Sequence, residues 1–165
     1  MMFGGGLFQE VVGLVDQWIP EKEYGHENKF QDVLGDFLRN KLRYQYQKRI
    51  PVNVRKNVHG IQVDVLVNKN IPIEMKRNLN KAQWRALDSE VGDYLNIYNS
   101  LIVVICGVEK EEVIDDLTNK YQGDQWGFTP QNLVVRVKRR KNYGKKPKKR
   151  TTPRRRIGFH VEDIL

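Results

Sequence analysis

The stretch Gly60–Arg77, GIQVDVLVNKNIPIEMKR, decides the fold of this chain. Apolar residues occupy alternate positions on both sides of Asn68–Asn70, as they do in strands with one buried face. Because Asn tolerates the left-handed backbone of a tight turn, Asn68–Asn70 predicts the turn of a β-hairpin. The apolar pairs that this turn creates are Val67 with Ile71, Val65 with Ile73 and Val63 with Met75. Register and alternation therefore agree on a hairpin.

The other face of this hairpin carries the chemistry. The same register sets Asp64 opposite Glu74 and Gln62 opposite Lys76, with Cβ atoms about 5 Å apart in each pair. Two facing carboxylates repel, and a divalent cation between them removes the repulsion. Hard oxygen ligands suit Mg²⁺ or Mn²⁺, and the Lys76 ammonium could position a water or stabilise developing charge. The alternative is a solvated face on which charged residues meet by chance.

Two further polar residues fall on apolar helical stripes. Glu27 lies one turn before Phe30 and Leu34, and Gln83 lies four residues before Leu87. An inward-facing polar group without a hydrogen-bond partner lowers the free energy of unfolding by about 1–3 kcal/mol. The alternatives are an acid that favours a helix start for Glu27 and, for Gln83, a cap on the backbone of a strand.

Periodicity predicts an α/β fold around the hairpin. The expected helices are Leu7–Ile19, Glu27–Leu42, Leu79–Tyr98 and Glu109–Tyr121. The expected strands are Ile61–Val67, Ile71–Lys76, Leu101–Cys106, Leu133–Val137 and Ile157–Val161, with residues 43–58 extended. The unbroken apolar run Leu101–Cys106 indicates a strand buried on both faces.

The spacing Asp64, nine residues, Glu74, one residue, Lys76 resembles the PD-(D/E)xK nuclease superfamily. This superfamily includes type II restriction endonucleases, archaeal Holliday junction resolvases and RecB-type nucleases. The resemblance covers Glu27–Cys106, about half of the chain. It implies an αβββαβ core with a mixed central sheet flanked by helices. Val63 departs from the pattern, because it stands where the family name has Pro.

The resemblance also implies roles for individual residues. The implied metal ligands are the carboxylates of Asp64 and Glu74, the backbone carbonyl of Met75, and Glu27 through a water or a second metal. Lys76 would be the catalytic lysine. Gln83 would match the glutamine often found on the helix after the motif. The implied cofactor is Mg²⁺ or Mn²⁺.

The positive charge is concentrated near the end of the chain. The protein has 165 residues with 29 Lys and Arg against 20 Asp and Glu, a net charge of +9. Residues 138–156, the basic block, contain Lys138, Arg139, Arg140, Lys141, Lys145, Lys146, Lys148, Lys149, Arg150, Arg154, Arg155 and Arg156, and no acid. We expect a nuclease-like domain over residues 1–137, a basic arm or loop over 138–156 and a strand or tail over 157–165. The simplest partner of such a block is a nucleic-acid backbone; a solubility tail and a targeting address are the alternatives.

The composition also excludes several classes. One cysteine rules out an intramolecular disulfide framework and a multi-cysteine zinc site. No apolar run reaches the roughly 20 residues of a membrane span, and the start lacks a secretory signal. We expect an intracellular protein without a membrane partner.

These observations predict a metal-dependent DNA endonuclease, with branched or junction DNA among its candidate substrates. Cutting both strands needs two sites, so we expect a homodimer, with Leu7, Val11, Leu14 and Trp18 as candidates for its interface. The alternative is a non-catalytic nucleic-acid-binding module on a degenerate nuclease fold. RNA is a third possibility, because phosphate contacts do not distinguish the sugars.

Overall fold

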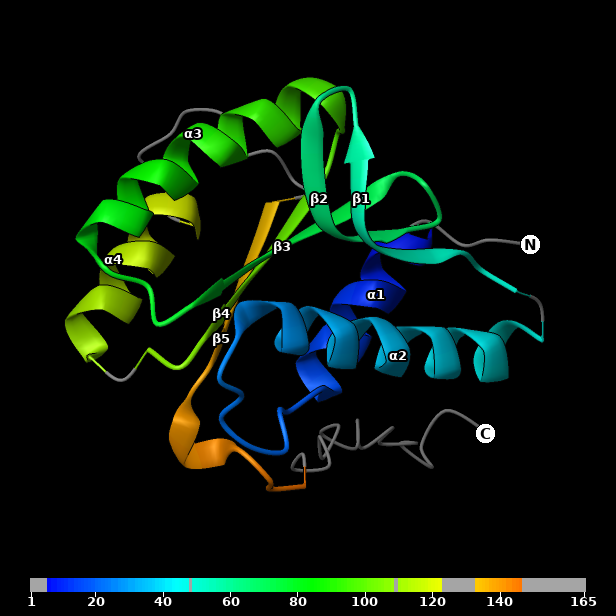
Figure 1. Ribbon diagram of the computed structural model, residues 1–165, viewed down its shortest axis with the longest axis horizontal. Helices are drawn as coiled ribbons and strands as arrows, with labels where there is room; N and C mark the ends of the chain where they lie inside the picture. Colours follow the sequence, from blue (N-terminus) through cyan, green and yellow to red (C-terminus); the bar gives the residue numbers. More distant parts are fainter. Residues whose placement is uncertain (1–5, 48, 109, 123–132, 147–165) are drawn as a thin grey trace, which may run out of the picture.

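The structure is a computed structural model that describes residues 6–47, 49–108, 110–122 and 133–146 (Figure 1). Its elements are α1 (Gly6–Gln17), α2 (Glu27–Tyr46), β1 (Val52–Val58), β2 (Ile61–Val67), β3 (Ile71–Arg77), α3 (Lys81–Ile97), β4 (Leu101–Cys106), α4 (Glu111–Gln122), β5 (Leu133–Lys138) and the 3₁₀ helix η2 (Arg140–Asn142). The predicted order of helix, three strands, helix and strand is present from α2 to β4.

The five strands form one mixed sheet in the order β1-β2-β3-β4-β5. The first three strands pair antiparallel, and β3, β4 and β5 pair parallel through the helical crossovers α3 and α4. This arrangement confirms the predicted α/β class with a mixed sheet.

The predicted hairpin register is confirmed next to the turn. The β2–β3 ladder pairs Val65 with Ile73, Leu66 with Pro72 and Val67 with Ile71. Asn68 and Lys69 adopt positive φ angles of 53° and 61°, which close the turn. The ladder does not continue to Asp64 and Glu74, so the strands part where the carboxylates lie.

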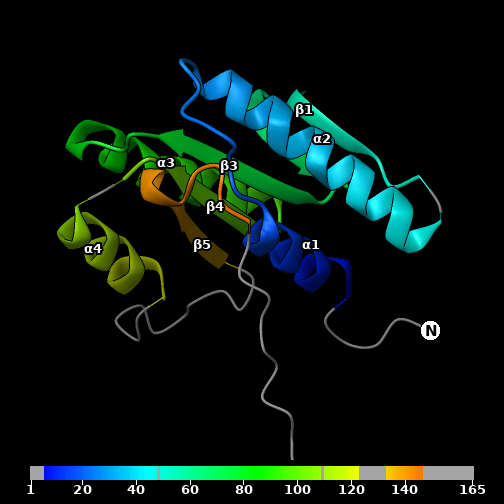
Figure 2. The ribbon, with the colours of Figure 1, turned by 90° about the horizontal axis from the view of Figure 1, so that it is seen from below.

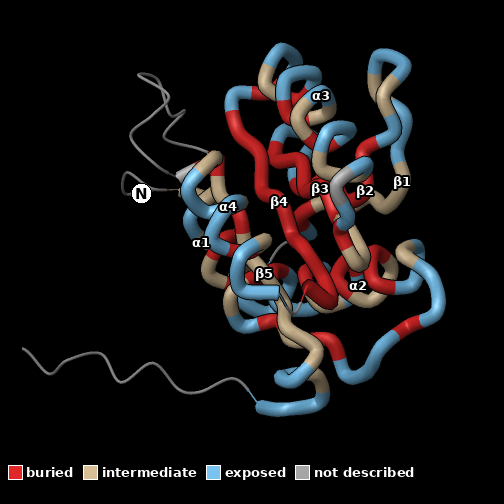
Figure 3. Tube along the Cα trace, turned by 90° about the vertical axis from the view of Figure 1, so that its left-hand side faces the viewer, coloured by how far each residue is buried: buried red, intermediate tan, exposed pale blue. Residues whose placement is uncertain are grey.

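Helices cover both faces of the sheet and create two cores (Figure 2). One core lies between the sheet and the pair α1 and α2, and the other lies between the sheet and the pair α3 and α4. Every residue of β4 is buried, as Figure 3 shows for the centre of the molecule. A Cβ atom at Gly35 would lie 2.6 Å from Val54 Cγ2, so this glycine lets α2 pack closely on β1.

Burial of α1 corrects one expectation about assembly. Val11 is 0%, Leu14 6% and Trp18 3% exposed, because α1 packs against the sheet and α2 within the same chain. Leu7 is half-buried against the same core. These side chains fill the protein's own core, so they do not form the predicted dimer interface.

The helix α2 is longer than expected. It continues to Tyr46, so residues 43–46 are helical and the extended segment begins later. Tyr46 packs against the core of α1 and α2, which favours the additional turn. Gln47 then ends the helix in the left-handed conformation, and its N–H donates to the carbonyl of Arg43.

The beginning of the basic block folds against the body. Lys138 is the last residue of β5, and η2 begins after one intervening residue, Arg139. The Tyr143 ring lies 6.2 Å from the Phe30 ring, and Gly144 N donates to the Pro20 carbonyl. Residues 138–146 thus pack on the domain, while Lys148, Lys149, Arg150, Arg154, Arg155, Arg156 and the predicted strand Ile157–Val161 lie outside the described residues.

No helix in the described part of the chain has the length and apolar character needed to cross a membrane.

Candidate metal-binding and catalytic site

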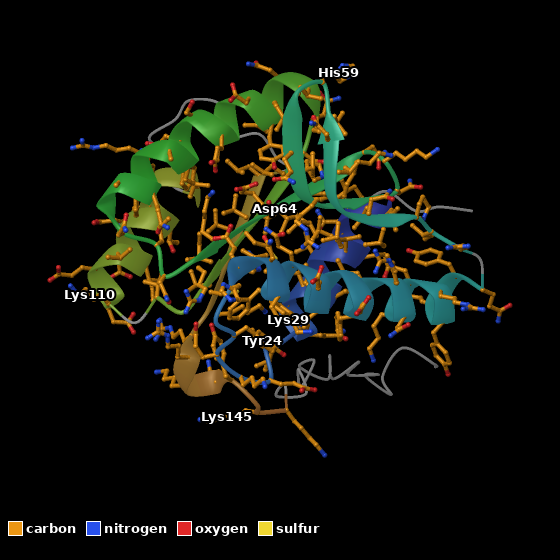
Figure 4. All side chains as sticks on the ribbon, in the orientation of Figure 1. Tyr24, Lys29, His59, Asp64, Lys110 and Lys145 are labelled. Carbon is orange, nitrogen blue, oxygen red and sulfur yellow. The ribbon has the colours of Figure 1, made fainter. Side chains whose placement is uncertain are left out.

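Asp64 occupies the point at which β2 and β3 part. Its Oδ2 accepts a hydrogen bond from the backbone N–H of Met75 at 2.8 Å. The last ladder pair on this side joins Val65 and Ile73. Beyond that pair, a backbone N–H of β3 donates to the Asp64 side chain instead of to a backbone carbonyl of β2. This contact turns the carboxylate of Asp64 toward β3, and Figure 4 shows Asp64 in the middle of the fold.

A backbone kink faces Asp64 on the other side. The β1–β2 ladder pairs Val54 with Val65 and Lys56 with Val63, and it omits Arg55 and Asp64 between them. Arg55 has a φ angle of 52°, a strained conformation for a residue with a long side chain. Its guanidinium is held on α2 by Gln31 Oε1 at 3.2 Å and Asp32 Oδ1 at 2.8 Å, together with the Asn28 carbonyl.

Glu74 and Lys76 lie on the face of β3 that α3 covers. Glu74 Oε1 lies 2.8 Å from Lys76 Nζ. Glu74 Oε2 accepts a hydrogen bond from the Tyr94 hydroxyl at 2.7 Å. Lys76 Nζ also lies 2.8 Å from Glu90 Oε2. Residues of α3 therefore hold Glu74 Oε2 and the ammonium of Lys76, and Lys76 in turn holds Glu74 Oε1.

Burial gives the two carboxyl groups unusual acidities. Asp64 and Glu74, 9% and 5% exposed, are the only buried acidic residues in the described part of the chain. Burial raises the pKa of Asp64 to about 6, assisted by the charge of Glu27 and opposed by the Met75 hydrogen bond. Burial and the charge of Asp64 raise the pKa of Glu74 to about 8, although Lys76 and Tyr94 act in the opposite direction.

Lys76 remains a cation in this environment. Burial lowers its pKa, but the charges of Glu74 and Glu90 outweigh burial, and the net pKa lies above the usual value. Its ammonium contacts the carboxylates of Glu74 and Glu90, and its charge also lowers the pKa of Asp64. With all three carboxyl groups ionised, this group of four side chains would carry a net charge of −2.

This donor set fits a divalent cation. Once ionised, Asp64 and Glu74 would offer two negative charges and the carboxylate oxygens that Mg²⁺ and Mn²⁺ prefer as ligands. Within the described residues, no group of three or more His, Cys, Asp or Glu side chains converges on one point. The protein ligands in reach are therefore the pair Asp64 and Glu74, which suits an ion that keeps several waters.

Glu27 and Gln83 have other immediate partners. Glu27 begins α2, and its Oε2 accepts a hydrogen bond from the backbone N–H of Arg77 at 3.1 Å. Its charge still raises the pKa of Asp64, which places it near the site. Gln83 forms a capping box with Asn80, in which its Oε1 accepts from Asn80 N and its own N–H donates to Asn80 Oδ1. The Gln83 side chain therefore stabilises the first turn of α3.

The first three basic residues of the block, at the end of β5, make hydrogen bonds or ion pairs with other parts of the chain. Lys138 Nζ donates to the Val15 carbonyl at 2.6 Å, and burial lowers the pKa of Lys138 to about 8. Arg139 forms a two-pronged contact with Glu111. Arg140 lies 3.3 Å from Glu23 and also contacts Asn78. Lys141, Lys145 and Lys146 are exposed, and Figure 4 shows Lys145 far from Asp64.

Three site residues carried no clear signal in the sequence. Tyr94 reads as a packing aromatic, and Glu90 as a charge on a helix. Their spacing of four residues does place them on one helical face, but only the packing of α3 on β3 shows which residues that face meets. The left-handed conformation of Arg55 has no sequence signature, because such conformations favour Gly, Asn or Asp.

Comparisons with known proteins give no neighbour for this chain: no protein-family model, no curated protein and no solved structure matches it.

Proposed function

We propose that the protein is a metal-dependent DNA endonuclease. The observation that carries the proposal is the buried carboxyl pair Asp64 and Glu74 beside the ammonium of Lys76. Two facing buried carboxylates destabilise a fold unless a cation or a proton lies between them. A site of this composition combines oxygen ligands for a cation with an ammonium for an anionic substrate.

The cation would be held by Asp64 and Glu74, with the Met75 carbonyl as the further ligand that the family resemblance implies. Bound there, Mg²⁺ or Mn²⁺ supplies Lewis-acid activation of a water and of the phosphodiester. The chain itself contributes the Lys76 ammonium, which orients the attacking water or stabilises the charge that develops on the phosphate.

Two residues of α3 support this chemistry as positioning residues. Glu90 holds Lys76 together with Glu74, since both carboxylates lie 2.8 Å from its Nζ. The Tyr94 hydroxyl lies 2.7 Å from Glu74 Oε2 and 3.2 Å from the Gln62 carbonyl oxygen, so its single proton is directed mainly to Glu74. Together they restrict the rotamers of the two residues that would meet the metal and the substrate.

Affinity for DNA would come in part from the basic block. Its described lysines at 141, 145 and 146 are exposed and have no ion pair with described residues. A duplex endonuclease must cut two strands, so we propose that a second copy of the chain is a partner. The two copies would meet through a surface other than the buried face of α1.

The test is cleavage of labelled linear duplex, single strand, flap and four-way junction with Mg²⁺, Mn²⁺ or EDTA. Wild type is compared with Asp64→Asn and Lys76→Met, and Asp93→Asn on the exposed face of α3 is the matched control. We expect metal-dependent cutting by wild type and control, and a loss of at least about 100-fold in both site variants. Cutting would also choose among the DNA substrates.

Binding of DNA without cutting on every substrate would contradict the proposal. That outcome would favour the non-catalytic nucleic-acid-binding module. Cutting that survives in Asp64→Asn would also contradict it, because the reaction would then proceed at another site.

A further inference from the structure

A second cationic region lies at the opposite end of α2 from Glu27. A surface cavity of about 810 Å³ opens between the last turns of α2 and the start of β1. It is lined by Arg39, Asn40, Arg43, Gln47, Arg49, Ile50, Pro51, Val52 and Asn53. All ionisable side chains in this lining are arginines, and the remaining polar side chains are amides.

Two of these arginines are free to meet a ligand. The side chains of Arg43 and Arg49 are exposed and form no ion pair or hydrogen bond with any described residue. Arg39 is the fixed member of the set, because its Nε donates to the Val52 carbonyl at 3.0 Å and its Nη1 lies 2.9 Å from Asp36. Asp36 does not line the cavity.

One explanation is that basic residues simply favour the carboxyl end of a helix. That effect falls off within the last turn of the helix. It accounts for Arg43, which lies in the last turn of α2. It does not account for Arg49, which follows the helix and faces the same cavity from the segment leading to β1.

We propose that this cavity binds backbone phosphates of DNA, an inference that rests on the proposed function. Guanidinium groups present planar pairs of N–H donors that match phosphate oxygens, and the Asn and Gln amides add neutral donors. A concave surface without lining carboxylates also concentrates positive potential. The site is separate from the basic block, which leaves the sheet at the end of β5 (Figure 1).

Tyr44 adds an aromatic surface beside this arginine cavity. It is 88% exposed, the most exposed large hydrophobic side chain among the described residues. It lies four residues after Asn40 and three before Gln47, so it borders two lining residues on the helix surface. An exposed ring next to arginines suits stacking on a sugar or an unpaired base.

The experiment measures how duplex affinity depends on salt. A fluorescein-labelled 30-base-pair duplex is titrated between 50 and 300 mM KCl, without metal, against the full-length chain. The double variant Arg43→Gln with Arg49→Gln is compared with Lys22→Gln with Lys56→Gln. The control removes the same charge from two exposed lysines outside the cavity.

We expect the slope of log K against log salt to become shallower by about 1–2 units in the arginine variant, since each phosphate contact contributes about 0.9. The lysine control should change it by less than about 0.5. An equal change in both variants, an unchanged slope, or no duplex binding by wild type would overturn the inference. If thermal melting shows that the double variant is unfolded, the single variant Arg49→Gln replaces it. The expected change in slope is then half as large.

Two further outcomes separate this inference from its alternatives. If wild type binds with the expected slopes but cuts no substrate with Mn²⁺, the cavity inference stands and the proposed nuclease function fails. Phosphatidylserine vesicles form a parallel arm. Loss of vesicle binding in the arginine variant, with an unchanged duplex slope, would assign the cavity to an anionic membrane surface and overturn the inference.

Discussion

Asp64 accepts the backbone N–H of Met75 through its side chain, across a gap at which β2 and β3 no longer pair. The hydrogen bond anchors a carboxylate between two strands and next to Glu74. In the interior of a strand, such an N–H normally donates to a backbone carbonyl of the neighbouring strand. This substitution brings an acidic side chain into a buried position, which is unfavourable for stability and which the proposed cation would offset.

The first prediction concerns this unfavourable burial. The pKa values of Asp64 and Glu74 lie above their ordinary values, mainly because of burial. The folded, metal-free protein therefore binds these protons more tightly than the unfolded chain, and its stability falls as pH rises from about 4 to about 8. Asp64→Asn should raise the free energy of unfolding at pH 8 by about 1 kcal/mol, with a smaller gain at pH 5.

Thermal melts of the EDTA-treated protein at the two pH values check this expectation. Asp93→Asn, an exposed position on α3, should leave the melting temperature unchanged. A loss of stability in Asp64→Asn at pH 8 would show that the ionised carboxylate stabilises the metal-free fold, contrary to the account.

The second prediction compares two tyrosines of α3. The Tyr94 hydroxyl donates to Glu74, whereas the buried Tyr98 hydroxyl has no hydrogen-bond partner among the described residues. Tyr94→Phe should cost about 2 kcal/mol of stability, because it leaves Glu74 Oε2 without its donor. Tyr98→Phe should be neutral or slightly stabilising. Urea denaturation measures both, and equal effects would refute the assigned contact.

The third prediction tests whether Glu90 positions Lys76. Glu90→Gln keeps the shape of the side chain but removes one of the two carboxylates at the ammonium. Cleavage should slow by about 10–100-fold, since a catalytic group loses an orienting partner. The loss should appear in kcat with little change in KM, because the Lys76 ammonium would act on charge that develops in the transition state.

Glu112→Gln on the exposed surface of α4 is the control for Glu90→Gln, because it removes the same charge away from the site. A loss that appears mainly in KM would mean that Glu90 acts on the packing of α3 and not on the orientation of Lys76.

The fourth prediction separates structural from exposed residues of the basic block. Lys138→Met removes the hydrogen bond to the Val15 carbonyl near the end of α1 and should cost about 1–2 kcal/mol of stability. Lys141→Met, at an exposed position, should change stability by less than about 0.5 kcal/mol. Denaturant titrations distinguish the two, and a harmless Lys138→Met would return this lysine to the candidates for DNA contact.

Local patterns in the sequence predicted most of the fold. The strand Leu101–Cys106 has the predicted bounds because an unbroken apolar run next to Gly107 leaves few alternatives. The hairpin register near Val67 and Ile71 follows from alternation and turn chemistry alone. The longer α2 was missed because Arg43–Tyr46 are polar or aromatic, and their helical conformation depends on Tyr46 packing against α1 and α2.

The candidate site was predicted only in part for the same reason. Asp64, Glu74 and Lys76 lie within one hairpin, so strand periodicity brings them together. Glu90 and Tyr94 approach them only through the docking of a distant helix, which periodicity does not specify. The capping box of Gln83 was not predicted, because the spacing of Gln83 from Leu79 and Leu87 also fits a residue on the apolar stripe of a helix.

The most direct test of the central claim is a calorimetric titration of the metal-free protein with Mn²⁺ at pH 7.5, for wild type, Asp64→Asn and the control Asp93→Asn. The account predicts that wild type and control bind Mn²⁺ with release of protons, because a cation displaces the proton that burial keeps on the carboxyl pair. Asp64→Asn should show no such binding. Wild type without Mn²⁺ binding, or a variant that binds as wild type does, would contradict the claim that Asp64 and Glu74 form a metal site.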